Sequence, residues 1–211
     1  MEFFSIKQVF FTILQYPVSY IEFIATICGI IAVYLAARSH ILTWPIGLIN
    51  ITLSFIIFWE VQLYSDVFLQ VYFFCISIYG WYNWRFEKRE CLPIKTLNTK
   101  ERLNSIYIII GCTAILGFMV SKLHLIFPSV FIKPAAYPYP DTFVAVCSVI
   151  ANTLLAKRIY ENWVLWIVVN IVCVGLYFSK GITFIAIQFF IFLILAIVGH
   201  LHWKKEISKA I

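Results

Sequence analysis

The amino-acid sequence predicts an all-α integral membrane protein in which seven transmembrane helices form a parallel internal repeat of three helices, one linker helix and three more helices (3+1+3). Of the 211 residues, 63% are hydrophobic and only 12% are charged, whereas soluble domains carry about 25% charged residues. The mean hydropathy is +0.92. Because a spanning helix needs roughly 20 residues, the chain has room for about seven or eight spans. This composition argues against a soluble enzyme and against a disordered chain.

Seven apolar runs of spanning length follow one another at 20–37, 41–59, 66–86, 104–124, 141–157, 162–179 and 182–203. We therefore divide the chain into an N-terminal interfacial segment (1–19), a first three-helix bundle (20–86), a polar linker with the linker helix and a proline-rich loop (87–140), a second three-helix bundle (141–203) and a basic cytoplasmic tail (204–211). Four prolines in 125–140 exclude a regular helix there, so we expect a structured loop at the membrane surface.

The basic residues predict how the spans are oriented. One side of the membrane would hold Arg38, Arg85, Lys88, Arg89, Lys95, Lys100, Arg102, Lys157, Arg158, Lys204, Lys205 and Lys209, and the other side Lys7, Lys122, Lys133 and Lys180. Cytoplasmic loops carry the excess of Lys and Arg. We therefore expect the N-terminus outside and the C-terminus in the cytoplasm. Since topology explains the net charge of +6, we expect no nucleic-acid partner.

An internal repeat appears when the sequence is compared with itself at an offset of 119 residues. Trp44 meets Trp163 in this register, and Gly80 and Trp84 meet Gly199 and Trp203. One inserted residue between these matches would bring Asn50 onto Asn170. An odd number of helices between the halves makes them parallel, as in some transporters. Duplication can also serve only to build a stable bundle.

Asp, Glu, Lys and Arg are missing from the middle of every predicted span. The acidic and basic residues fall near helix ends, as do the four histidines. Proton-coupled carriers place such a group at depth, so we expect passive or indirectly driven movement of a solute. The sequence also lacks Ser/His/Asp sets, paired carboxylates, Gly-x-Gly-x-x-Gly and cysteine spacings for metals. We expect no enzymatic activity, no cofactor and no metal.

The polar residues at depth are amides. Asn50 and Asn170 lie roughly 13 Å into their helices, and Gln70 and Gln188 are the other deep amides. Four amides supply both donors and acceptors for a neutral, hydroxyl- or amide-bearing solute. In membrane helices, amides also serve as hydrogen-bonding groups between helices.

Aromatic residues accompany these amides at helical spacing. Two faces are continuous, one with Trp163, Trp166, Asn170, Cys173 and Tyr177, the other with Gln70, Phe74, Ser77, Trp81 and Trp84. Aromatic pairs around an amide suit a flat ring, and a cationic ring would gain about 2 kcal/mol once desolvated. Trp59, Trp84 and Trp203 lie near helix ends, where we expect interfacial belt residues.

Several segments resemble the PnuC family of vitamin transporters over nearly the whole chain. They include Gly47-Leu48-Ile49-Asn50, the run from Leu69-Gln70 to Gly80-Trp81-Tyr82, and above all Asn162-Trp163-x-x-Trp166-x-x-x-Asn170. The resemblance implies a SWEET-like seven-helix homotrimer of the bacterial cytoplasmic (inner) membrane. It implies facilitated import of nicotinamide riboside, a vitamin B3 precursor of NAD, which a cytoplasmic kinase traps by phosphorylation. It places Trp163, Trp166 and Asn170 at the site, with Asn50, Gln70, Phe74, Tyr177, Gln188 and Trp44 as further contacts.

Other functions remain open at this point. A branch of the same family takes thiamine, which is also a cationic heteroaromatic ring. A sugar carrier on the same fold and a membrane scaffold or receptor without transport activity are the remaining alternatives.

Overall fold

The computed structural model describes residues 8–13, 16–61, 64–87, 93–126 and 134–210. A short hairpin of β1 (Val9–Ile13) and β2 (Tyr16–Ser19) precedes seven helices: α1 (Tyr20–Ala37), α2 (Thr43–Glu60), α3 (Tyr64–Glu87), α4 (Thr99–Ile126), α5 (Pro138–Ala156), α6 (Asn162–Ser179) and α7 (Thr183–Ala210). Parts of the expected interfacial segment, the polar linker and the proline-rich loop (1–7, 88–92 and 127–133) lie outside these residues.

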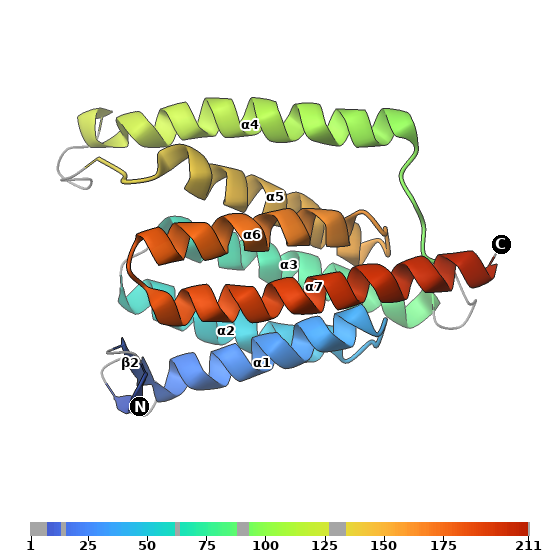
Figure 1. The fold of residues 1–211 in the computed structure, drawn as a ribbon, viewed down its shortest axis with the longest axis horizontal. Coiled ribbons are helices and arrows are strands. Elements are labelled where there is room, and N and C mark those ends of the chain that lie inside the picture. Colours follow the sequence, from blue (N-terminus) through green and yellow to red (C-terminus); the bar gives the residue numbers. More distant parts are fainter. Residues whose placement is uncertain (1–7, 14–15, 62–63, 88–92, 127–133, 211) are drawn as a thin grey trace.

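Contacts between neighbouring helices close six of them into a ring, which Figure 1 shows from the side. In this ring α1 packs against α2 and α7, α3 packs against α2 and α5, and α6 packs against α5 and α7. Tyr72 on α3 donates to the Val149 carbonyl of α5 at 3.1 Å, which joins helices far apart in the sequence. The remaining helix, α4, packs against α5 on the outside of the ring.

The ring has two distinct ends, because successive helices run in alternating directions (Figure 1). The connections α1–α2, α3–α4 and α5–α6 and the C-terminus share one end, which we call the basic end after Arg38, Lys157, Arg158 and Lys204. The β1–β2 hairpin and the starts of α3, α5 and α7 share the other end, which we call the hairpin end.

Six described helices are long and apolar enough to cross a membrane, and α3 is not among them. The expectation of seven such runs is therefore met for six. The 24 residues of α3 include Asp66, Asn83 and Arg85 together with several Tyr and Trp residues, and these lower its hydropathy although the helix is long enough to span.

Helix boundaries differ from the expected ones where local capping decides them. The α4 helix begins at Thr99 rather than 104, because Asn98 and Glu101 exchange hydrogen bonds of 2.8 and 2.9 Å between side chains and backbone N–H groups. The α5 helix begins at Pro138, inside the segment expected to be a loop, since proline is tolerated in a first helical turn. The expected tail at 204–211 continues α7 as far as Ala210.

The expected interfacial segment contains a hairpin that is tied to the helices. Tyr16 donates to Glu22 at 2.8 Å and stacks on Phe184 with 5.4 Å between ring centroids. Ser19 and Glu22 form a capping box that begins α1. Burial beside the Glu22 carboxylate raises the pKa of the Tyr16 phenol. The hairpin therefore packs on α1 and α7 at the hairpin end.

Several helix boundaries and turns recur at a separation of 119 residues. The α2 and α6 helices both have 18 residues, and their first and last residues are 119 apart. The residues with positive φ that follow α1 and α5, Ser39 (53°) and Arg158 (54°), have the same separation. The inserted residue expected from the sequence is therefore wrong. Asn50 corresponds to Val169, and Asn170 lies one residue further along α6.

Candidate functional site

One face of α6 carries most of the expected site residues and points into the ring. Cys173 and Asn170 are buried, with 1% and 3% exposure, and Trp166 and Tyr177 are half-buried on the same face. The opposite face of α6 is exposed through Val164, Val168, Ile171 and Phe178. The structure thus places Trp166, Asn170 and Tyr177 along one face of α6, with Trp166 toward the basic end, Asn170 at middle depth and Tyr177 toward the hairpin end.

The amides of Asn170 and Asn50 differ in how they are used. Asn50 donates from Nδ2 to the Ala25 carbonyl of α1 at 2.7 Å, so its amide joins α2 to α1. Among the described residues, no side-chain hydrogen bond involves Asn170. Buried amides normally have partners, and Asn170 therefore offers an unused donor and acceptor inside the ring.

Helices α1, α2 and α7 converge next to Asn50. A Cβ atom at Gly29 would lie 3.1 Å from Nδ2 of Asn50 and 3.3 Å from Cζ of Phe192. Glycine at this position is what lets the amide and the ring approach α1 so closely. The Thr26 hydroxyl donates to Oε1 of Gln188 at 3.5 Å, which places Gln188 beside the same stretch of α1.

Three aromatic rings connect the region of Asn170 with that of Asn50. Tyr177 stacks on Phe189 with 5.3 Å between ring centroids, and Phe189 meets Phe192 edge to face at 6.1 Å. Sequence reasoning missed Phe189, Phe192 and Thr26, because two phenylalanines in a long apolar run carry no distinguishing signal. Only Gly29, a small residue inside a span, marks the close approach.

The expected site residues Trp44 and Trp163 lie near the basic end, in a cluster with Trp84 and Trp203. The Trp44 and Trp84 rings are 5.3 Å apart, Trp84 and Trp203 6.2 Å, and Trp163 and Trp203 5.7 Å. Trp84 and Trp203 were expected in an interfacial belt, and this is wrong: both are buried, because small residues of α1, α5 and α7 leave room for their rings. Trp59 is exposed.

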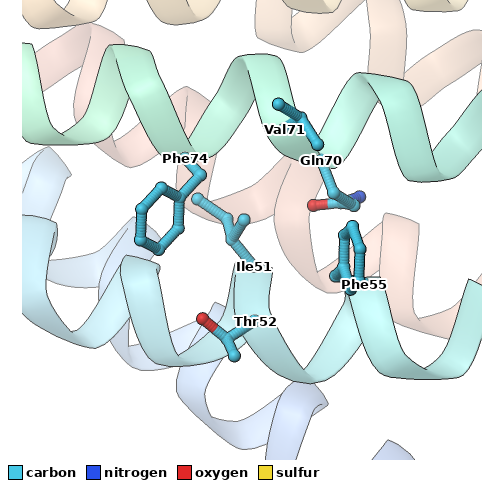
Figure 2. Close-up of a pocket in the computed structure, with 6 residues that line it drawn as sticks. All are labelled: Ile51, Thr52, Phe55, Gln70, Val71 and Phe74. Carbon is cyan, nitrogen blue, oxygen red and sulfur yellow. The ribbon is translucent and has the colours of Figure 1, made fainter.

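Gln70 and Phe74 lie apart from the α6 face. Together with Ile51, Thr52, Phe55 and Val71 they line a groove of about 260 Å³ between α2 and α3 (Figure 2). Thr52, Val71 and Phe74 are exposed, so the groove opens on the outside of the ring. Gln70 and Gln188 are also out of register, because α3 and α7 begin 119 residues apart and the two glutamines lie one position off that register.

Charged groups in the described chain lie at the ends of the helices. At the hairpin end, Lys180 pairs with Asp141 at 3.1 Å and lies over the rings of Tyr137 and Tyr177. At the basic end, Arg102 pairs with Glu161 at 2.8 Å. The candidate site between them is built from amides, aromatic rings and a hydroxyl, which can hydrogen-bond and stack but cannot exchange protons near neutral pH.

Comparison with known proteins identifies relatives over almost the full length. The model of the family described as "Nicotinamide mononucleotide transporter" matches residues 19–205. The nicotinamide riboside transporter PnuC of Escherichia coli (strain K12) is 29% identical over 227 residues, which cover 96% of this chain and 94% of that protein. The riboflavin/roseoflavin transporter RibM of Streptomyces davaonensis is 23% identical, with 92% and 88% covered.

A solved structure shares the fold. The crystal structure of the vitamin B3 transporter PnuC superimposes with a TM-score of 0.69 at 22% identity, covering 90% of this chain and 83% of that one. Together with the family match across 19–205, this agrees with the motifs in α2, α3 and α6. The chain belongs to the PnuC family of membrane transporters, whose members are transport proteins and not enzymes.

Proposed function

We propose that this protein transports nicotinamide riboside across the membrane by facilitated diffusion. The relatives that carry this function in their names match nearly the whole chain. The observation that carries the proposal is the buried Asn170 amide, which has no side-chain partner among the described residues and shares its face with Trp166 and Tyr177. An unused amide beside aromatic rings suits a ligand with a flat ring and polar substituents.

The chemistry of nicotinamide riboside fits this arrangement. Its pyridinium ring is cationic and would stack against one of the two flanking rings, Trp166 or Tyr177, with about 2 kcal/mol from cation–π attraction in a desolvated site. The Asn170 amide would pair with the carboxamide, and Gln188 and Asn50 would face the ribose. Trp44 and Trp163 would form the floor of the site. We leave Gln70 and Phe74 out of the contact set, because they line the outward groove.

Passive movement follows from the same residues. A coupled carrier needs a titratable group at depth, and the described site is built from uncharged side chains. Import would then depend on removal of the free nucleoside inside the cell. Phosphorylation by a cytoplasmic kinase would serve, because it adds charge that the uncharged site does not balance.

We further propose the finer arrangement of the chain in the membrane. All seven helices would span it as a SWEET-like 3+1+3 parallel repeat in the bacterial inner membrane, with the basic end in the cytoplasm and the N-terminus outside. Equivalent helix boundaries and turns 119 residues apart support the repeat, and the Lys and Arg bias supports the orientation. Cytoplasmic exposure of a C-terminal reporter would agree, and exposure of that reporter on the outer side would contradict it.

A homotrimer is the assembly that we propose. The outward surface of α3 supports contact with another copy, because Gln70 and Tyr79 place polar groups where lipid offers no hydrogen-bond partner. Native mass spectrometry in mild detergent would report three chains, whereas a monomer at all concentrations would contradict the assembly.

The substrate proposal is tested by calorimetric titration of the purified protein with nicotinamide riboside, thiamine, riboflavin and glucose. We expect saturable binding of the riboside alone. Thiamine binding without riboside binding would move the protein to the thiamine branch. Riboflavin is included because the RibM relative covers 92% of this chain. If none of the four ligands bound, a scaffold or receptor would replace a transporter of these solutes. Uptake of labelled riboside into proteoliposomes would then distinguish transport from binding.

A further inference from the structure

The tryptophan plug, defined here as Trp44, Trp84, Trp163 and Trp203, fills the ring at the basic end. It forms one buried cluster with the small residues Ala36, Ala37, Ala156 and Ala196 and with Leu155. These residues come from α1, α2, α3, α5, α6 and α7, which are all six helices of the ring. Each of them is at most 8% exposed, so the plug and its neighbours leave no described opening at this end.

Two equivalent hydrogen bonds hold the plug together across the two halves of the ring. The Trp84 indole N–H donates to the Leu155 carbonyl at 3.2 Å, and the Trp203 indole N–H donates to the Ala36 carbonyl at the same distance. Both donors and both acceptors are 119 residues apart. Each bond therefore joins a helix of one half to the first helix of the other half.

Each of the other two tryptophan rings packs closely on the backbone of a glycine, a position that we call a glycine seat. A Cβ atom at Gly199 would lie 2.7 Å from the Trp163 ring, and one at Gly80 would overlap the Trp44 ring. The rings thus lie directly on the backbones of α7 and α3. This arrangement is closely packed. Among the described contacts of the four tryptophan rings, the contact of Trp84 with Trp203 is the one that joins the two halves.

The hairpin end has no described cluster of this extent. One buried cluster there joins α1 and α2 through Ile21, Ala25 and Leu53. A further cluster, with Ile109, Cys147, Val169 and Cys173, lies at middle depth and joins α4, α5 and α6. Neither of these two clusters crosses the ring from one half to the other, so the described core seals the ring across its full width at the basic end.

The plug also leaves polar groups unsatisfied. The Nε1 atoms of Trp44 and Trp163 are buried without a hydrogen-bond partner among the described residues. A buried N–H group without a partner destabilises the closed state, and a hydrogen bond to water would remove this cost. Because the two atoms occupy equivalent positions, opening of the plug would relieve the same cost in both halves.

We propose that the tryptophan plug is the gate at the basic end of the transport pathway, and that it opens when Trp84 separates from Trp203. This proposal rests on the proposed transport function. The closed plug blocks passage from the candidate site to the basic end. Opening breaks the hydrogen bonds from Trp84 to the Leu155 carbonyl and from Trp203 to the Ala36 carbonyl. The two halves of the ring then rotate relative to each other.

Accessibility of Cys173 tests the gate without any substrate. Cys173 lies on the α6 face of the site, and the remaining cysteines can be replaced to make it the single thiol. In inside-out vesicles, we expect a charged, membrane-impermeant methanethiosulfonate reagent to modify it slowly. Trp203→Phe and Trp84→Phe keep a ring but remove the N–H donor, and each should speed modification about five- to tenfold.

The control is Trp59→Phe, which makes the same chemical change at an exposed position on α2, and its modification rate should match that of the parent protein. Thermal unfolding of every variant checks folding. Equal rates in Trp84→Phe, Trp203→Phe and Trp59→Phe would reduce the plug to static packing. Absence of riboside binding would overturn the proposed substrate but would leave these rates measurable, so the two failures are distinguishable.

Discussion

The two halves of the ring agree at the basic end and differ at middle depth. At the basic end, Trp84 and Trp203 make equivalent hydrogen bonds to Leu155 and Ala36. At middle depth, the Asn50 amide is used between helices, whereas Asn170 takes the position one residue after the equivalent of Asn50. A nucleoside has no two-fold symmetry, so equivalent residues cannot contact equivalent atoms of it. The difference teaches that equivalent contacts are confined to the packed basic end and that the two halves diverge at the candidate site.

The largest expected effect comes from replacing the unused amide. Asn170→Leu should weaken nicotinamide riboside binding by ~100-fold or more, because polar groups of the ligand would be left unpaired in a desolvated site. Calorimetry measures the affinity, and unchanged thermal unfolding shows that the protein is folded. Affinity within a few-fold of the parent would make Asn170 a packing residue.

The glycine seats give the next effect and test whether the halves are equivalent. Gly80→Ala and Gly199→Ala should each destabilise the protein by about 1–3 kcal/mol, because the added methyl groups overlap Trp44 and Trp163. Thermal or denaturant unfolding in detergent would measure the loss. Gly47→Ala is the matched control, since its Cβ would meet only the Ala32 Cβ at an ordinary 3.9 Å. A loss confined to one seat would show that the halves have diverged here too.

Replacing Asn50, whose amide is already hydrogen-bonded within the protein, should affect stability more than substrate binding. Asn50→Leu removes the bond to the Ala25 carbonyl and should cost about 1 kcal/mol of unfolding free energy. Its effect on riboside affinity should be smaller than that of Asn170→Leu. If the two substitutions weakened binding equally, the asymmetry at middle depth would not extend to recognition.

The smallest effect concerns a contact found in the second half. Glu161 accepts from the Leu97 N–H at 3.0 Å and pairs with Arg102, and its equivalent in the first half is Leu42. Arg102→Met should cost less than about 0.5 kcal/mol, because the Arg102 side chain is 55% exposed and solvent screens the pair. A larger loss in an unfolding assay would mean that the linker helps to hold the second half together.

Much of the candidate site was visible in the sequence, and its limits have physical causes. The α6 face was predicted because Trp166, Asn170 and Tyr177 recur at helical spacing on one helix. Phe189 and Phe192 were missed because an apolar run gives no sign of which side chains face inward. Gln70 and Phe74 were grouped with the site because of their helical spacing. A helical face that borders a neighbouring helix has one buried and one exposed edge, and spacing alone does not distinguish the two edges.

The sequence by itself determined the membrane class, the number and approximate limits of the helices, and the matches between residues 119 positions apart. Hydropathy and periodicity are local properties of the chain, and they are sufficient for these features. Only the tertiary structure decided that Trp84 and Trp203 are buried partners of opposite halves, that Asn50 is committed to α1, and that the ring closes by contact of α1 with α7 and of α3 with α5. These depend on which helices become neighbours, and that is settled by packing between residues far apart in the chain.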